Sequence, residues 1–165
     1  MKSPLKAALI GTAILAAAAI PAGAATATAA SAPATHPALT DQQRQAIVAR
    51  FASAIVHDDH AGILASTTPG IVWTIPGHSK VSGVSIGQAA VIRLADTFAR
   101  FDLHISPQAL TFGVDTVAVE VHDTGEHNGR SLDIQVVNVL SIRDGRISAV
   151  EGNVSDVAAN DRYFS

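Results

Sequence analysis

Two histidines in the second half of the chain are able to carry acid/base chemistry. His104 lies between Leu103 and Ile105, and His122 ends a run in which valine alternates with other residues. An imidazole titrates near neutral pH and can therefore exchange a proton with a bound substrate. His122 can equally belong to a solvated face opposite the valines, and the sequence leaves the face of His104 open. Both are candidate catalytic residues.

Asn138 is a polar residue on an otherwise apolar face of a predicted strand. Side chains alternate between the two faces of a strand, and this face also carries Leu132, Ile134, Val136, Leu140 and Ile142. A buried amide needs hydrogen-bond partners. Asn138 therefore either contacts a ligand or bonds to a neighbouring side chain or a water molecule.

The run His57-Asp58-Asp59-His60 has residue types that bind metals, with imidazoles at positions i and i+3. It falls between two predicted helices, where polar residues end a helix and meet water. We expect no metal site there. The sequence also has no phosphate loop, nucleophile elbow, CxxC or HExxH pattern, and we expect no cofactor.

The first part of the chain resembles an export signal. Lys2 and Lys6 precede an apolar run over residues 7–20, and small residues follow. We predict cleavage after Ala24, with alternative sites near residues 30–32. A retained anchor is the competing interpretation, but the run is shorter than the roughly 20 residues of a membrane-spanning helix. This predicts a signal peptide (1–24), an Ala/Thr/Pro-rich linker (25–38) and one exported, periplasmic or secreted domain (39–165).

Charge and composition limit the partners of that domain. Without Lys2 and Lys6, nine basic residues stand against 14 acidic ones, for a net charge of about −5. This balance argues against nucleic acid and against an anionic membrane surface as partners. Because the chain has no cysteine, an exported domain must be stabilised by its core rather than by disulfides.

Helical patterns occupy the first half of the domain. Thr40 and Gln43 form a capping box, and Ile47, Phe51 and Ile55 recur at four-residue spacing, which predicts a helix over 41–57. A short helix is expected over 61–66. A second capping box, Ser85 with Gln88, predicts a third helix ending near residue 100.

Strand patterns dominate the rest. A short strand over 71–75 is ended by Pro76-Gly77, and four further strands are predicted over 103–112, 116–122, 132–142 and 146–154. Asp144-Gly145 indicates a hairpin, and a turn is expected over 125–129. Helices followed by antiparallel strands predict an α+β domain with helices on one face of a curved sheet.

Three segments resemble the SnoaL-like branch of the nuclear transport factor 2 (ketosteroid isomerase-like) superfamily. They are VWTIPGHSKVSGVSIGQAAV (72–91), GRSLDIQVVNVLSIRDGRISAVEG (129–152) and SDVAANDRYFS (155–165). The resemblance implies a cystatin-like α+β roll, in which a cone-shaped, strongly bent antiparallel sheet wraps around three N-terminal helices. It also implies an apolar pocket inside the cone and a possible homodimer through the sheet.

The resemblance does not extend to the catalytic residues of the ketosteroid isomerases. Those enzymes use an Asp base and an oxyanion hole made of a Tyr and a protonated Asp. Phe51 stands at the place of the tyrosine, Ile75 at that of the base, and Asn138 at that of the second aspartate. Steroid isomerisation by that mechanism is therefore not expected.

The resemblance implies which residues surround the pocket: Phe51, Trp73, Ile75, Phe98, Asn138, Leu140 and Asn153. It adds Asp156 as a third catalytic candidate, because a recurrent aspartate of this branch could lie over the pocket mouth. Alternatively, Asp156 caps a terminal turn that carries Tyr163 and Phe164 onto the domain.

Two functions are compatible with these residues. The first is binding of a small hydrophobic molecule without catalysis and without stable membrane association. The alternative is a cofactor-free acid/base enzyme, an isomerase, cyclase/lyase or hydrolase, that uses some of His104, His122, Asn138 and Asp156. A titratable side chain in the pocket favours the enzyme, and a pocket without one excludes it.

Overall fold

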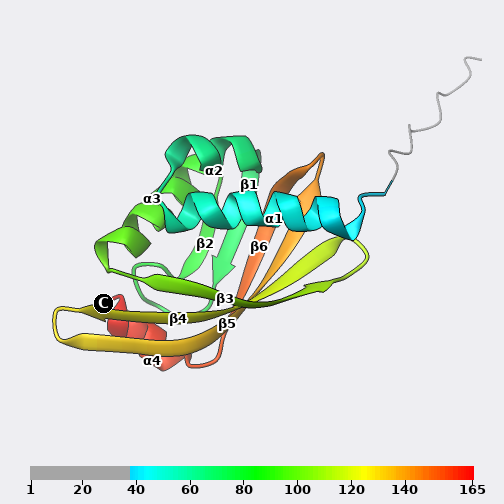
Figure 1. Cartoon of the computed structure of the whole chain (residues 1–165). Coiled ribbons are helices and arrows are strands. Elements are labelled where there is room, and N and C mark those ends of the chain that lie inside the picture. The colour runs from blue at the N-terminus through cyan, green and yellow to red at the C-terminus, as the bar shows by residue number, and fades with distance from the viewer. Residues whose placement is uncertain (1–37) are drawn as a thin grey trace, which may run out of the picture. The chain divides into compact units, whose positions relative to one another are not determined.

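The computed structural model describes residues 38–165, which fold into helices on one side of a curled sheet (Figure 1). The predicted leader and most of the linker lie outside the described residues. The helices are α1 (Asp41–Val56), α2 (His60–Ser66), α3 (Gln88–Arg100) and α4 (Val157–Tyr163). The strands are β1 (Thr67–Ile75), β2 (Gly83–Ile86), β3 (His104–Phe112), β4 (Thr116–His127), β5 (Arg130–Arg143) and β6 (Arg146–Val154).

The sheet is six-stranded and open, in the order β2-β1-β6-β5-β4-β3. Four neighbouring pairs are antiparallel, and β1 runs parallel to β6. The register shifts between Pro107 and Ala109 and again between Ser141 and Ile142. Such irregularities bend a strand and increase its twist. The long strands curl around the helices (Figure 1), and the predicted α+β class is confirmed.

Helix α1 begins as the sequence predicts. The Thr40 hydroxyl accepts from the backbone N–H of Gln43 at 3.2 Å, and the Gln43 side chain accepts from the Thr40 N–H at 2.9 Å. This reciprocal cap satisfies two backbone donors that a helix N-terminus leaves free. The apolar stripe of the helix, which includes Ile47, Phe51 and Ile55, is buried.

The predicted cap of α3 is wrong. Ser85 belongs to β2, and the N-cap is Gly87, which has no side-chain bond to the helix and a φ of 83°. A glycine is favoured at such a positive φ. The amide of Gln88 does not reach back to Ser85 and donates instead to the carbonyls of Leu64 and Thr67. Gln88 thus ties α3 to the end of α2.

Several strand ends differ from the prediction. β1 begins at Thr67, earlier than expected, and the four-residue edge strand β2 was not predicted. β4 continues to His127, and the turn lies at Asn128-Gly129, whose φ values are 51° and 74°. The Asp144-Gly145 hairpin is confirmed, with φ values of 51° and 71°. Paired positive φ values are those of a type I′ turn, which matches the twist of a hairpin.

The C-terminus completes the core. Tyr163 and Phe164 are 0% and 1% exposed, and the Tyr163 hydroxyl donates to the carbonyl of Phe101. The Phe164 ring lies 5.9 Å from Phe98, which belongs to α3. Within residues 38–165, no helix is long and apolar enough to cross a membrane.

A carboxylate on α4 holds the loop between β1 and β2. Asp161 accepts from the backbone N–H groups of His78 and Ser79 at 2.9 and 3.0 Å, and from the Ser82 hydroxyl at 3.2 Å. These hydrogen bonds favour the charged carboxylate and lower the pKa of Asp161 below its ordinary value, with the His78 bond as the largest cause. Gly77 has a φ of 110°, and a Cβ there would lie 2.3 Å from the Asp161 carboxylate, so a glycine is favoured at this position.

Candidate functional site

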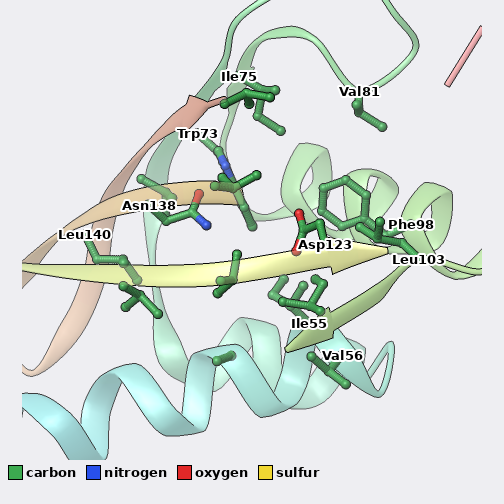
Figure 2. Close-up of a pocket in the computed structure, with 18 of the residues that line it drawn as sticks. Ile55, Val56, Trp73, Ile75, Val81, Phe98, Leu103, Asp123, Asn138 and Leu140 are labelled. Atoms are coloured by element: carbon green, nitrogen blue, oxygen red, sulfur yellow. The ribbon is translucent and has the colours of Figure 1, made fainter. Parts of the chain in front are cut away.

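A pocket of about 100 Å³ lies between the helices and the inner face of the sheet (Figure 2). Its walls are almost entirely apolar, and Val56, which is 50% exposed, lies at its edge. An apolar cavity of roughly 150 Å³ binds benzene. This pocket has about two thirds of that volume and is open at one edge, so it fits a molecule no larger than about one small ring.

Six of the seven side chains expected at the pocket line it: Phe51, Trp73, Ile75, Phe98, Asn138 and Leu140. Trp73 packs between two of the others, with its ring 5.6 Å from Phe51 and 6.1 Å from Phe98. Because α1, β1 and α3 each supply one of these rings, one wall of the pocket is aromatic.

Asn153 does not line the pocket. It lies between Gly152 and Val154 on β6, and those two residues face the pocket. Alternation along the strand then turns Asn153 outward. Its side chain is exposed and donates to the carbonyl of Val137 at 3.1 Å.

The histidine candidates also lie outside the lining. His122 is on the outer face of β4, where its Nε2 lies 2.7 Å from the Asp133 carboxylate. His104 is exposed at the start of β3, while its neighbours Leu103 and Ile105 line the pocket. Alternation explains both placements, since the residues on either side of each histidine take the inner face: Leu103 and Ile105 beside His104, and Val121 and Asp123 beside His122.

Asp156 is the N-cap of α4. Its carboxylate accepts from the backbone N–H of Ala159 at 2.8 Å, which is the capping geometry expected of aspartate. It is exposed and does not line the pocket. The capping interpretation of the sequence therefore describes its position.

A titratable side chain does line the pocket, and it is Asp123. It follows Val119 and Val121 on the inner face of β4, and all three residues line the cavity. Asp123 as a whole is only partly buried, but its Oδ1 is fully buried and has no hydrogen-bond partner among the described residues. Burial raises the pKa of Asp123 to about 7, against a smaller lowering effect of the His122 charge.

The sequence contains a signal that could have identified Asp123. The alternation of Val117, Val119 and Val121 continues to Asp123 if the strand continues beyond His122. Because the predicted strand ends at residue 122, Asp123 falls outside its inner face. A carboxylate in register with buried valines is a polar residue in an apolar position, which is the feature that marked Asn138.

Three further polar groups belong to the lining. The indole Nε1 of Trp73 and the amide Nδ2 of Asn160 are buried and have no hydrogen-bond partner among the described residues. Asn138 pairs with Gly152 on β6, and a Cβ at Gly152 would lie 3.5 Å from the Asn138 Oδ1. Gly152 therefore lies directly beside the Asn138 amide, at a distance where an added Cβ would be in van der Waals contact with it. Figure 2 shows Asn138 and Asp123 pointing into the same pocket.

The polar run over residues 57–60 lies where α1 ends and α2 begins. Asp59 is the N-cap of α2 and accepts from the backbone N–H of Gly62 at 3.0 Å. His60 lies 2.8 Å from Asp96 and 3.5 Å from Asp58, so these three side chains could hold a cation at the surface. The His60 pKa is raised, mainly by its hydrogen bond to Asp96. The cluster lies outside the pocket lining.

Comparison with known proteins identifies the family. The family model of the SnoaL-like domain matches residues 48–150. No curated protein sequence matches the chain.

Solved structures agree with this fold. A cystatin-like protein of unknown function from Xanthomonas campestris is 26% identical, with a TM-score of 0.67 over 73% of this chain and 97% of that one. A nuclear transport factor 2-like protein from Burkholderia xenovorans is 23% identical, with a TM-score of 0.69 over 76% and 98%. A candidate SnoaL-like polyketide cyclase from Jannaschia sp. CCS1 is 19% identical, with a TM-score of 0.58 over 73% and 92%. The chain therefore belongs to the SnoaL-like domain family.

Proposed function

We propose that the domain binds a small apolar molecule in the pocket and transfers a proton to or from it through Asp123. The observation that carries this proposal is a carboxyl group with a buried, unpartnered Oδ1 in an otherwise apolar lining. Of the two functions compatible with the sequence, this observation favours the acid/base enzyme.

The protonation state of Asp123 suits such a role. General acids and bases work best when their pKa lies near the working pH, and the pKa of Asp123 is about 7. At neutral pH a large share of the molecules then hold the proton on Asp123, and the rest can accept one. An ordinary aspartate would be almost fully ionised and could not act as a proton donor.

A small cyclic enol ether, 3,4-dihydropyran, tests this proposal without knowledge of the natural substrate. The Asp123 carboxyl would protonate the alkene carbon farther from the ring oxygen, leaving positive charge shared by the oxygen and the adjacent carbon. Water then adds to that carbon, and its extra proton returns to the Asp123 carboxylate. The product, 2-hydroxytetrahydropyran, is followed by NMR.

We expect a protein-dependent rate that is highest below pH 7 and falls as the pH rises further, because the acid form of Asp123 is required. Asp123→Asn should remove this rate, and His104→Gln should leave it unchanged because His104 lies outside the lining. A rate that survives in Asp123→Asn contradicts the proposal. Bound dihydropyran without hydrolysis would support the non-catalytic binding function.

Location and partners are part of the same proposal. An exported, periplasmic or secreted domain is supported by the charged and apolar start of the chain. A small hydrophobic ligand is supported by the pocket walls. The mature domain is the chain that remains after the predicted cleavage at Ala24. Size-exclusion chromatography of this mature domain tests the possible homodimer. Mass spectrometry of the exported protein tests cleavage after Ala24.

A further inference from the structure

We infer that the pocket favours positive charge on its ligand, and so takes neutral hydrophobic substrates that become cationic when Asp123 protonates them. Enol ethers, epoxides and electron-rich alkenes belong to this class. Small apolar amines should bind as stable mimics of the charged intermediate. The inference deepens the proposed function and rests on it for the identity of the proton donor.

The charge of the lining is the first argument. Within residues 38–165, Asp123 is the single ionisable side chain that lines the pocket, and no Lys, Arg or His does so. The lining is therefore neutral when Asp123 is protonated and carries one negative charge when it is not. In neither state does it offer a positive side chain to an anionic ligand.

The surroundings of Asp123 provide no counter-charge. Its register partners on the neighbouring strands are Ile105 on β3 and Ile134 on β5. In Figure 2 the carboxylate lies among apolar side chains from α1 and α3, with Asn138 on the opposite side. His122 is the one titratable group that acts on Asp123, and it lies on the outer face beside Asp133.

A bound cation would supply the missing partner. Burying an unpaired carboxylate is costly because it loses its hydration, and a cation beside it restores a favourable interaction. The cluster of Phe51, Trp73 and Phe98 adds aromatic rings to the same lining, and ring faces attract cations. A bound anion would lose its own hydration and also meet the negative charge of Asp123.

The lining also contains two uncharged hydrogen-bond donors, which suit a neutral substrate. Trp73 Nε1 and Asn160 Nδ2 can donate hydrogen bonds to an ether or epoxide oxygen, and both have no partner among the described residues. A buried donor without a partner is costly, so a ligand oxygen would be stabilised at either place. These groups orient the substrate, and Asp123 then supplies the proton.

Three ligands with the same ring but different charge test the inference: cyclohexylamine, cyclohexanol and cyclohexanecarboxylate. Binding to the mature domain is measured at pH 8 by calorimetry or NMR titration. We expect the amine to bind at least about tenfold more tightly than the alcohol, the factor that corresponds to about 1.4 kcal/mol. The carboxylate should bind more weakly than the alcohol.

Two further conditions attribute the preference to Asp123. In the unaltered chain at pH 5, where Asp123 is protonated, the amine should lose most of its advantage over the alcohol. In Asp123→Asn the amine should lose most of its advantage over the alcohol at pH 8, because only the attraction of the aromatic rings remains. An amine that binds no better than the alcohol at pH 8, or a preference that persists undiminished in Asp123→Asn, overturns the inference.

The two proposals can fail separately. If dihydropyran is hydrolysed through Asp123 and the amine shows no advantage, the proposed function holds and the charge preference is wrong. If the amine is preferred through Asp123 and dihydropyran is not hydrolysed, the charge preference holds and the proton-transfer function is wrong. Inhibition of the hydrolysis by cyclohexylamine would connect the two.

Discussion

Asp123 and Asp161 are carboxylates of one domain in opposite environments. Asp123 lies in the apolar pocket with an Oδ1 that has no partner among residues 38–165, and its pKa is raised to about 7. Asp161 accepts hydrogen bonds from two backbone N–H groups and a serine hydroxyl, and its pKa is lowered. Desolvation without hydrogen bonds makes a carboxyl group titrate at neutral pH, whereas hydrogen bonding keeps it charged.

The difference separates a candidate reactive group from a structural one. Asp123 lines a cavity, and a ligand can reach it. Asp161 joins α4 to the loop after β1, and its lone pairs are used within the protein. Changing each residue to asparagine should therefore affect different properties of the domain.

The largest difference is expected in activity. Asp123→Asn should lower the rate of dihydropyran hydrolysis by at least about 100-fold, since a positioned proton donor contributes roughly 10²–10⁴-fold. Asp161→Asn should change it by no more than about threefold at a temperature where the variant is folded, because Asp161 does not line the pocket. Equal loss of activity in both variants, with both still folded by circular dichroism, would remove the distinction between the two carboxylates.

The second difference concerns stability at pH 8. The folded chain holds the Asp123 proton up to about pH 7, while the unfolded chain releases it near 3.8. The folded state therefore binds more protons in this window, and its stability falls as the pH rises from about 4 to 7. Asp123→Asn removes that loss and should raise the unfolding free energy at pH 8 by roughly 2–4 kcal/mol, the upper value being the full shift at about 1.4 kcal/mol per pKa unit.

Urea denaturation at several pH values measures this effect. The unaltered chain and Asp123→Asn should differ most at pH 8 and least near pH 4, where the aspartate is protonated in the folded state and close to half-protonated in the unfolded one. If the two chains differ in unfolding free energy by the same amount at every pH, the pKa of Asp123 is not raised in the folded chain.

Asp161 should show the opposite sign. Its folded-state pKa is lowered, so its contribution is present above the unfolded value of 3.8 and is lost as the pH falls through the folded value. Asp161→Asn should lower the melting temperature at pH 7, because the amide offers one acceptor oxygen where the carboxylate has two. The difference in melting temperature between the unaltered chain and Asp161→Asn should become smaller in strong acid. A difference that grows there would contradict the lowered pKa of Asp161.

The smallest effect is expected at Gly152. A Cβ there would lie 3.3 Å from the Thr74 carbonyl and 3.5 Å from the Asn138 Oδ1. Gly152→Ala should press on the Thr74 carbonyl and fill the space beside the Asn138 amide, which should weaken cyclohexanol binding by about two- to fivefold, with a stability loss below about 1.5 kcal/mol. Tighter binding in the variant would mean that the pocket is wider at Asn138 than the structure has it.

Much of the fold follows from local patterns in the sequence. The capping box of α1, the bounds of β6 and the Asp144-Gly145 hairpin each depend on a few adjacent residues, and each is confirmed. β2 and the cap of α3 do not follow from such patterns because they depend on tertiary contacts. Ser85 is drawn into pairing with Trp73, and Gly87 donates to the Ile71 carbonyl at 2.7 Å.

The polar part of the pocket is harder to predict than its apolar walls. The resemblance to a known family points to Trp73 and Phe98 because their place in the fold is fixed by packing. The titratable residue depends on where β4 ends, and a boundary shift of a single residue moves Asp123 between loop and inner face. Histidines are acid/base candidates because an ordinary imidazole titrates near neutral pH. In this pocket, burial raises the pKa of an aspartate into the same range, which residue type alone does not indicate.

Direct titration of Asp123 tests the central claim. The chemical shift of its side-chain carboxyl carbon, followed by NMR between pH 3 and 9 and assigned by its absence in Asp123→Asn, reports the pKa of this group alone. We expect a midpoint near 7, which should fall when cyclohexylamine binds. A midpoint near the ordinary 3.8, unchanged by the amine, would contradict both the proton-transfer function and the charge preference of the pocket.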